Sequence, residues 1–453
     1  MAGRGFLVPL LLALAAGAPP SPDSPPNVVL ILVDDLGWTD LGCFGSRFYE
    51  TPHIDRLASR GMRFTQAYAA CTVCSPTRAS LMTGKYPPRV GITDWIPGHP
   101  RPKAKLKVPE IARELALEET TLAEILKGAG YATAAVGKWH LGGPGFHPDR
   151  QGFDLNVGGC EKGQPPSYFA PYRIPTMAEG EKGEYLTDRL AREAVQFIEA
   201  NRDRPFFLYL AHYAVHTPLM GKEEVVRKYR ARAGAGAGHS NPVYAAMIEA
   251  VDDGVGRILA CLEALKLASR TVVIFTSDNG GLLRITSNAP LRAGKGSAYE
   301  GGVRVPLIVD WPGVTRPGAV CEAPVVSPDL FCTILEMAGR KAPEGVDGES
   351  LVPLLRGAGG LRREAIYWHY PHYHPGGATP HGAVRKGDYK LIEFFEDGRV
   401  ELYNLREDVG EKRNLVLEEP GRARELRGLL AAWRSSVGAR MPVPNPEFDP
   451  RAK

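Results

Sequence analysis

Five short apolar runs, each rich in β-branched or aromatic residues, recur along the chain and alternate with amphipathic segments. The runs that we predict as strands cover residues 27–33, 131–137, 205–211, 271–277 and 305–311. Continuous apolar runs of this length are typical of strands that are buried on both faces of a sheet. Between them, apolar residues recur at helical spacing, which predicts helices at 52–60, 120–127, 187–200 and 247–265. The alternation predicts an α/β fold with a large, mainly parallel or mixed sheet that is sandwiched by helices.

The pattern changes near the end of the chain. Residues 357–363 are rich in Gly and Arg and are typical of a linker. Short alternating runs follow, and then a segment with helical periodicity; these segments cover residues 365–370, 389–395, 399–405 and 421–433. We therefore expect a main domain at 27–356, which carries the chemistry, and a smaller C-terminal α+β subdomain at 357–453 with an antiparallel sheet.

The first residues have the layout of a secretory signal. Arg4 precedes an apolar run, and a small-residue A-x-A site follows at 16–18. The run is too short to span a bilayer comfortably, and no second apolar stretch reaches the required length. We expect a signal peptide at 1–18, a tether at 19–26, and a secreted or periplasmic protein without a stable membrane anchor. The alternative is a frayed apolar N-terminus.

Acidic and amide side chains follow two of the predicted strands. Asp34 and Asp35 end the first strand, and Asp278 and Asn279 end the fourth. Carboxyl ends of parallel strands meet at one edge of a sheet, so these groups are expected to lie close together. Three carboxylates and an amide oxygen favour a hard divalent cation, Ca²⁺ or Mg²⁺, over zinc or copper. An isolated Asp-Asp pair would instead suggest helix capping, and both acids can meet one ion only if the chain bends at Asp34.

Basic residues follow the other two strands of this group. The second strand leads into Lys138 and His140, and the third leads to His212 and His216. Ionisable groups therefore gather at equivalent places in four strand-to-loop connections, which indicates a functional site rather than chance.

Residues 71–84 contain a CxxC pair, which alone would suggest a redox dithiol or half of a zinc site. No second CxxC follows, and the segment resembles the sulfatase signature C-x-P-x-R at Cys74, Pro76 and Arg78. The resemblance to this family, which is arylsulfatase A-like and belongs to the alkaline phosphatase superfamily, extends along most of the chain. Its fragments appear in the expected order at residues 27–45, 51–68, 137–142, 206–218, 275–281 and 294–306. Thr77 is a departure, because serine or alanine is more usual at this position in the family.

The resemblance implies both a cofactor and a set of site residues. Cys74 would be oxidised to Cα-formylglycine by a formylglycine-generating enzyme, a transient partner, and the aldehyde hydrate would lie beside one calcium ion. The implied metal ligands are Asp34, Asp35, Cys74, Asp278 and Asn279. The implied catalytic residues are Cys74, Arg78, Lys138, His140, His216 and Lys295. Arg78 would hold the hydrate, His140 would act as the base that regenerates the aldehyde, and the lysines would bind sulfate. His216 would assist the leaving alcohol, whereas His212 is expected in the core or behind the site.

We therefore expect a sulfuric ester hydrolase that acts on a sulfated small molecule or glycan, with carbohydrate sulfate preferred. The alternatives are a phosphonate monoester or phosphodiester hydrolase of the same superfamily, and an inactive binder of sulfated glycans. The formal charge of +4, from 55 basic and 51 acidic residues, does not favour a nucleic-acid partner. His372 and His374, in an aromatic stretch, are candidates for substrate specificity or for packing. The basic segment 101–107 is expected to be a solvated loop, or otherwise a cationic rim; the pairing of the six cysteines other than Cys74 stays open.

Overall fold

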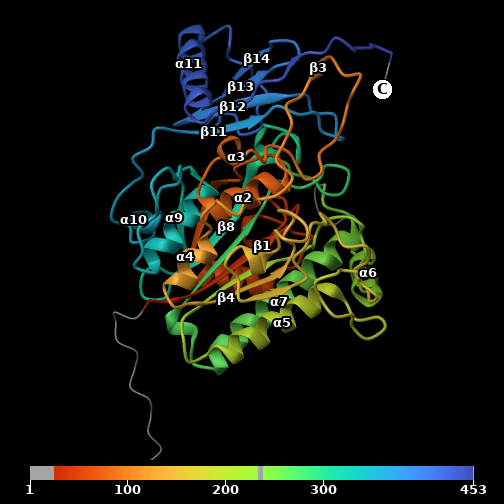
Figure 1. The fold of residues 1–453 in the computed structure, drawn as a ribbon, viewed down its shortest axis with the longest axis vertical. Coiled ribbons are helices and arrows are strands. Elements are labelled where there is room, and N and C mark those ends of the chain that lie inside the picture. Colours follow the sequence, from red (N-terminus) through yellow and green to blue (C-terminus); the bar gives the residue numbers. More distant parts are fainter. Residues whose placement is uncertain (1–24, 233–237, 452–453) are drawn as a thin grey trace, which may run out of the picture.

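The computed structural model describes residues 25–232 and 238–451, and it has the expected α/β architecture (Figure 1). A nine-stranded sheet has the order β10-β2-β8-β7-β1-β6-β4-β5, and β9 also pairs with β2. The strands are β1 Asn27–Val33, β2 Met62–Tyr68, β4 Ala132–Gly137, β5 Leu155–Val157, β6 Phe206–Ala211, β7 Thr271–Ser277, β8 Arg304–Asp310, β9 Ala319–Cys321 and β10 Val325–Val326. The expected signal peptide at 1–18 lies outside the described residues, as does most of the glycine- and alanine-rich segment 233–238.

The sheet is mixed, with a parallel centre. Strands β5, β4, β6, β1 and β7 pair in parallel, whereas β8 runs antiparallel to both β7 and β2. Residues 278–303 connect β7 to β8 and contain one short helix, α8 at Glu300–Val303, but no crossover helix that would carry the chain back to the opposite edge of the sheet. Strand β8 therefore runs antiparallel to β7. These connecting residues therefore begin at the carboxyl edge of the parallel strands, where the acids of the sequence analysis were expected.

Helices cover both faces of the sheet. In β1, Val29, Ile31 and Val33 pack in a cluster with α1, α5 and α7, whereas Val28, Leu30 and Leu32 pack in a second cluster with α2, α4 and α9. This alternation explains why β1 is apolar at every position, because each of its faces is buried. The helices are α1 Pro52–Arg60, α2 Cys74–Thr83, α3 Pro87–Val90, α4 Leu122–Gly128, α5 Leu186–Ala200, α6 Glu223–Arg230, α7 Pro242–Ala264, α8 Glu300–Val303, α9 Pro328–Met337 and α10 Val352–Leu355.

Helix starts follow capping chemistry. Thr121 and Glu124 form a capping box that fixes the start of α4, because each side chain accepts a hydrogen bond from the other residue's backbone N–H. Asn241 accepts from the backbone of Val243 and Tyr244, so α7 starts five residues earlier than its apolar periodicity indicates.

The C-terminal part forms a four-stranded antiparallel sheet in the order β11-β12-β13-β14, followed by a long helix (Figure 1). Its elements are β11 Ala365–Tyr370, β12 His381–Lys386, β13 Tyr389–Phe394, β14 Val400–Asn404 and α11 Pro420–Ser436. Strand β12 was not predicted from the sequence. The sheet shares one hydrophobic cluster with earlier residues, among them Tyr68 and Val303. A second small sheet pairs β3 Leu106–Lys107 with β15 Val443–Pro444. The expected fold class is confirmed, whereas a domain boundary at residue 357 stays a prediction.

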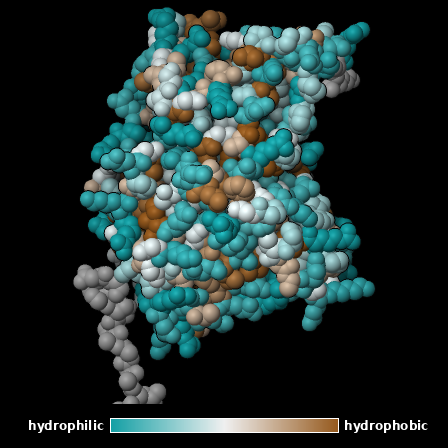
Figure 2. Space-filling model, viewed as in Figure 1, coloured by the Kyte–Doolittle hydropathy of each residue, from teal (hydrophilic) through white to brown (hydrophobic). Residues whose placement is uncertain are grey.

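Hydrophilic side chains cover most of the face shown in Figure 2, with small hydrophobic patches between them. Within residues 25–232 and 238–451, no helix has the length and apolar character that a bilayer span requires.

Candidate active site

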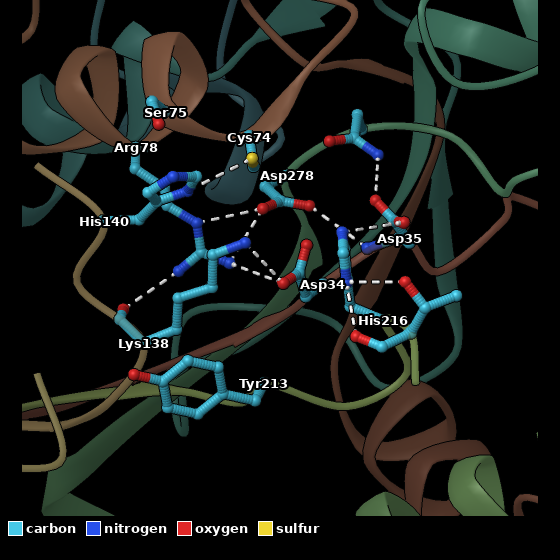
Figure 3. A network of polar contacts seen from close by, with 12 residues as sticks. Asp34, Asp35, Cys74, Ser75, Arg78, Lys138, His140, Tyr213, His216 and Asp278 are labelled. Atoms are coloured by element: carbon cyan, nitrogen blue, oxygen red, sulfur yellow. Dashed lines mark hydrogen bonds and ion pairs between the residues drawn. The ribbon is translucent and has the colours of Figure 1, made fainter. Parts of the chain in front are cut away.

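The parallel strands β1, β4, β6 and β7 bring charged residues to one edge of the sheet (Figure 3). Asp34, Lys138 and Asp278 directly follow three of these strands, and all three side chains are fully buried. The chain turns sharply just after the strands, because Asp35 has φ 61° and His140 has φ 59°. These left-handed conformations are uncommon outside glycine. The bend expected at Asp34 therefore lies at the next residue and turns both acids toward the same side.

The acidic groups form a compact cluster of oxygen atoms. The backbone N–H of Asp35 donates to Asp278 Oδ1 at 3.2 Å, and Asn279 Nδ2 donates to Asp35 Oδ1 at 2.8 Å. Two further oxygens, Asp34 Oδ1 and Asn279 Oδ1, are buried and accept no hydrogen bond from any described residue. Unpartnered buried oxygens are costly unless something else compensates them. Because both atoms are ligand types that calcium prefers, the donor set fits a hard cation.

Each carboxylate in the cluster also has a basic partner. Lys138 Nζ lies 2.6 Å from Asp34 Oδ2, and Lys295 Nζ lies 2.6 Å from Asp35 Oδ1. Arg78 donates to Asp278 Oδ2 through both Nε and Nη2, at 2.9 and 2.7 Å. The three cations lie on three different segments, so the cluster ties α2, the loop after β4 and the loop before β8 together.

The basic partners offset burial to different degrees for the two acids that follow β1. Burial, and then repulsion by Asp278, raises the pKa of Asp34 well above its usual range, even though Lys138 opposes the shift. Burial acts in the same direction on Asp35, but the nearby Lys295 lowers the pKa of that carboxyl below its usual range. A divalent cation would favour the ionised form of Asp34 as well.

A second donor set overlaps the first. Asp34, Asp35 and His216 offer ligand atoms that all lie within 4.8 Å of one another, and His216 Nε2 is 3.7 Å from Asp35 Oδ2. The ligand set expected from the sequence instead joins the two acids to Asp278 and Asn279. For calcium or magnesium the oxygen set fits better, because an imidazole nitrogen is a softer ligand than these ions prefer.

Cys74 is the first residue of α2 and is almost fully buried. No side chain caps this helix, so its free N–H groups and the positive end of its dipole lie near residue 74. Arg78 follows one turn later on the same face of the helix. Thr77 Oγ1 accepts from the N–H of Cys71 at 3.2 Å and donates to the carbonyl of Val73 at 3.3 Å. The unusual threonine therefore holds the turn that leads into the helix.

His140 lies against Cys74, with Nδ1 3.4 Å from Sγ (Figure 3). Its other nitrogen, Nε2, lies 2.5 Å from the carbonyl oxygen of Ile96. Burial and the charge of Lys138 lower the pKa of His140 well below its usual range, so the ring is neutral. Because a carbonyl can only accept, Nε2 carries the proton and Nδ1 presents a lone pair to residue 74.

The two histidines after β6 have different surroundings. His216 Nδ1 donates to the carbonyl of Thr217 at 2.8 Å, and burial, followed by Lys295, lowers its pKa to about 3. His212 is fully buried, both of its ring nitrogens lack a partner among the described residues, and burial lowers its pKa to about 4. Only His216 lines the cavity described next.

A cavity of about 730 Å³ borders Cys74. Side chains with basic nitrogens line it at His140, Lys162, His216, Arg284, Lys295 and His374. Apolar side chains line it at Trp95, Ile96, Pro97, Leu282, Leu283 and Pro375. Arg78 and Lys138 are fully buried and do not line the cavity. They form ion pairs with Asp278 and Asp34, respectively. The cavity can thus hold an anionic group together with a partly apolar body.

Several lining residues were missed in the sequence analysis. The Ile96 contribution is a backbone carbonyl, which leaves no residue-type signal. Lys162 follows β5 at the same sheet edge as the acids, so its position in the fold could have indicated it. Leu283 is 57% exposed, and an exposed leucine carries little information without a structure.

Other sequence candidates lie away from the cavity. The side chains of Lys103, Lys105 and Lys107 are exposed and do not line it, in agreement with a solvated loop. Arg304 Nε donates to the carbonyl of Thr65 at 2.7 Å, which is a structural contact. None of the seven cysteines, all of which lie in the described residues, forms a disulfide bond: Cys43, Cys71, Cys74, Cys160, Cys261, Cys321 and Cys332.

Comparison with known proteins gives consistent matches. The family model described as Sulfatase matches residues 26–340, and the model described as N-sulphoglucosamine sulphohydrolase, C-terminal, matches residues 294–430. A protein named sulfatase from Formosa agariphila is 34% identical, over 95% of this chain and 92% of its own length. Arylsulfatase A of Homo sapiens is 35% identical over 90% of this chain and 86% of its own. N-acetylgalactosamine-6-sulfatase of Sus scrofa is 38% identical over 81% and 73%.

Solved structures resemble the whole described fold. The crystal structure of Ps i-CgsB in complex with k-i-k-neocarrahexaose superposes with a TM-score of 0.79 at 30% identity. That alignment covers 94% of this chain and 95% of the other. A phosphonate monoester hydrolase of Agrobacterium radiobacter shares the fold at 20% identity, with a TM-score of 0.67 and coverage of 91% and 96%.

Proposed function

The chain belongs to the sulfatase family and is therefore an enzyme of this class, and on that premise we propose that it hydrolyses sulfate esters of carbohydrates with residue 74 as the nucleophile. The observation that carries the proposal is the position of Cys74. Cys74 borders the cavity, and its Sγ lies 3.4 Å from a neutral imidazole nitrogen of His140. It is also the first residue of α2, the helix whose Arg78 donates hydrogen bonds to Asp278 of the acidic cluster.

The nucleophile in this proposal is Cα-formylglycine, formed from Cys74 by the formylglycine-generating enzyme. Its hydrate would supply two hydroxyls on one carbon, one to attack sulfur and one to expel sulfate, whereas a serine would be left as a stable sulfate ester. The positive end of α2 favours negative charge on the oxygens at residue 74. His140 Nδ1, with its lone pair facing residue 74, is suited to take a proton from a hydroxyl there.

We propose that one calcium ion binds the oxygen set of Asp34, Asp35, Asp278 and Asn279, next to residue 74. The two buried oxygens without a partner, on Asp34 and Asn279, support this assignment. When bound, the ion would supply positive charge that lowers the pKa of a neighbouring hydroxyl and stabilises the developing negative charge. Arg78 and Lys138 hold Asp278 and Asp34 in place for that role.

Lys295 and His216 would face the sulfate group, since both line the cavity beside Asp35. A bound sulfate ester adds negative charge near His216, which would raise the pKa of the imidazole from its low value. His216 Nε2 would then carry a proton when the substrate is present and could donate it to the leaving alcohol.

The carbohydrate part of the proposal is supported by the cavity and by the relatives. The apolar side chains of the lining offer surfaces on which a sugar ring can pack, while the basic nitrogens suit its anionic substituent. One similar protein is named N-acetylgalactosamine-6-sulfatase, and one similar structure is a complex of Ps i-CgsB with k-i-k-neocarrahexaose. Export by residues 1–18 would bring the enzyme to such glycans, and N-terminal sequencing of the mature protein tests this.

The test combines two measurements on the purified enzyme. Mass spectrometry of the tryptic peptide from Phe64 to Arg78 should show formylglycine at residue 74. Sulfate release should follow from at least one member of a panel of sulfated mono- and disaccharides. An unmodified thiol in fully active protein would contradict the nucleophile. A higher kcat/KM for an aryl phosphonate than for the matched aryl sulfate would favour the phosphonate alternative, and binding of sulfated sugars without turnover would favour an inactive binder.

A further inference from the structure

His374 brings a residue of the C-terminal part of the chain to the cavity. It lies in the loop between β11 and β12, and it lines the cavity together with Pro375 and Gly376. Both His372 and His374 are specificity candidates from the sequence. The structure separates them, because His372 does not line the cavity and its Nε2 lies 2.8 Å from Thr93 Oγ1.

The ring of His374 is held in one orientation by two glycines. The N–H of Gly376 donates to His374 Nδ1 at 3.0 Å. The ring also lies directly on Gly296, where a Cβ atom would come within 2.3 Å of Cγ and Nδ1. Gly296 has φ 87° and follows Lys295, so glycine at this position allows His374 to approach the sulfate-binding lysine.

These contacts also fix the position of the ring proton. Because Nδ1 accepts a hydrogen bond, a neutral ring must carry its proton on Nε2. Burial, followed by the charge of Lys295, lowers the pKa of His374 to about 4, so the ring is neutral near pH 7. No described residue forms a hydrogen bond with Nε2, and the small exposed part of the side chain belongs to the cavity lining. The result is a fixed, uncharged donor beside a cationic subsite.

We propose that His374 is a specificity-determining residue whose Nε2–H donates to a hydroxyl or ether oxygen of the sugar, next to the sulfate ester. This inference rests on the proposed function and names the part of the substrate that the C-terminal subdomain recognises. In the proposed function Lys295, which lines the cavity, is the partner of the sulfate charge, whereas an uncharged donor matches a neutral sugar oxygen. A substrate without that oxygen leaves the donor unpaired in a largely buried position, which costs affinity.

The experiment compares His374→Phe, which keeps a flat ring without a donor, with His374→Gln, which keeps an N–H donor. His372→Phe, two residues away and outside the cavity, is the matched control for loop packing. For each variant, kcat/KM is measured with N-acetylgalactosamine 6-sulfate, galactose 6-sulfate and 4-nitrophenyl sulfate, whose leaving group has no sugar hydroxyl. Thermal melting shows whether each variant is folded.

We expect His374→Phe to lower kcat/KM for the sulfated sugars roughly tenfold, as for a lost hydrogen bond, and to change the aryl sulfate value by less than about twofold. His374→Gln should restore much of the loss. Equal losses on both substrate types, or the same pattern in His372→Phe, would overturn the proposal. If the wild-type enzyme cleaves 4-nitrophenyl sulfate but no sulfated sugar, the carbohydrate function fails and this inference fails with it. If it cleaves a sulfated sugar and His374→Phe is unchanged, only this inference fails.

Discussion

Nδ1 of His140 lies 3.4 Å from Sγ of Cys74, and the opposite side of the same ring is fixed by the carbonyl of Ile96. This pairing gives residue 74 a neutral base whose lone pair cannot rotate away. The two histidines also occupy different positions, because His140 faces residue 74 whereas His216 lies beside Asp35.

Replacing His140 by alanine should slow the second half of the reaction more than the first. If His140 Nδ1 takes the proton that leads to sulfate expulsion, the alcohol still departs once and the sulfated enzyme accumulates. We expect kcat to fall by about 10²–10⁴, with a burst of 4-nitrophenol in rapid-mixing experiments with 4-nitrophenyl sulfate. The variant His212→Asn is the control, since His212 is equally buried but does not line the cavity. Loss of the burst itself would place His140 in the first step instead.

Removal of calcium should destabilise the protein as well as inactivate it. Without a cation, the buried carboxyl of Asp34 faces Asp278, and the pKa of Asp34 is raised well above its usual range. A ligand that binds only the folded state stabilises it by mass action, so calcium should raise the melting temperature after chelator treatment. Asn279→Leu should shift that calcium titration to higher concentrations, because it removes a buried oxygen that has no other partner. An identical titration in Asn279→Leu and in the exposed control Asp397→Asn would contradict the ligand assignment.

The charged residues at the strand ends could be predicted from the sequence more completely than the residues that line the cavity. The strands that end at Asp34 and Asp278 are continuous apolar runs, and their C-terminal acids lie at one edge because parallel pairing requires it. No comparable signal predicts α2, because all ten of its residues are buried and it therefore lacks the division into an apolar and an exposed polar face. The contribution of Ile96 is a carbonyl oxygen, and the orientation of His374 depends on space beside Gly296. Every residue has a backbone carbonyl, and the contact between His374 and Gly296 joins segments that are far apart in the sequence. Neither feature can therefore be recognised from the residue types of one segment.

The buried His381 of the C-terminal sheet should make the free energy of unfolding depend on pH. A substitution of this residue can isolate its contribution. His381 is packed against Tyr370 and Phe394, and burial lowers its pKa from 6.5 to about 4. As the pH falls, His381 is therefore protonated in the unfolded chain at a higher pH than in the folded protein. The stability linked to His381 is fully present above about pH 6.5 and is lost as the pH falls toward 4.

The variant His381→Phe removes this titration and keeps an aromatic ring. The difference in unfolding free energy between wild type and variant should shift in favour of the variant by on the order of 2 kcal/mol between about pH 7 and about pH 4.5. Urea unfolding of both proteins at each pH measures it. Acids with raised pKa values, such as Asp94 at about 7, change the absolute curve but cancel in the difference. A difference that does not vary with pH would contradict the prediction.

A buried ion cluster should control how the C-terminal sheet is joined to the loop that carries Lys295. Lys390, on β13, places Nζ 2.8 Å from Glu300 Oε1 and 3.2 Å from Glu411 Oε1, and all three side chains are fully buried. Glu300 lies just after Lys295 in the chain, and its N–H donates to Glu411 Oε2 at 2.7 Å. Lys390→Met leaves Glu411 without its ion-pair partner and Glu300 with only Arg304, whose Nη1 lies 3.4 Å away, and should cost about 3–5 kcal/mol of unfolding free energy.

Glu300→Gln combined with Lys390→Met should recover part of that loss, because the unpaired carboxylate of Glu411 then no longer faces a second buried negative charge. Arg422→Ala, which breaks an exposed pair with Glu419, should cost no more than about 1 kcal/mol and serves as the control. Chemical unfolding gives the stabilities, and the KM for 4-nitrophenyl sulfate reports on the placement of Lys295. If Lys390→Met lowers stability and leaves KM unchanged, the cluster holds the sheet without positioning Lys295. A stability loss no larger than that of Arg422→Ala would contradict the cluster's role in joining the two parts, since removing a buried cation from two carboxylates cannot cost as little as removing an exposed one.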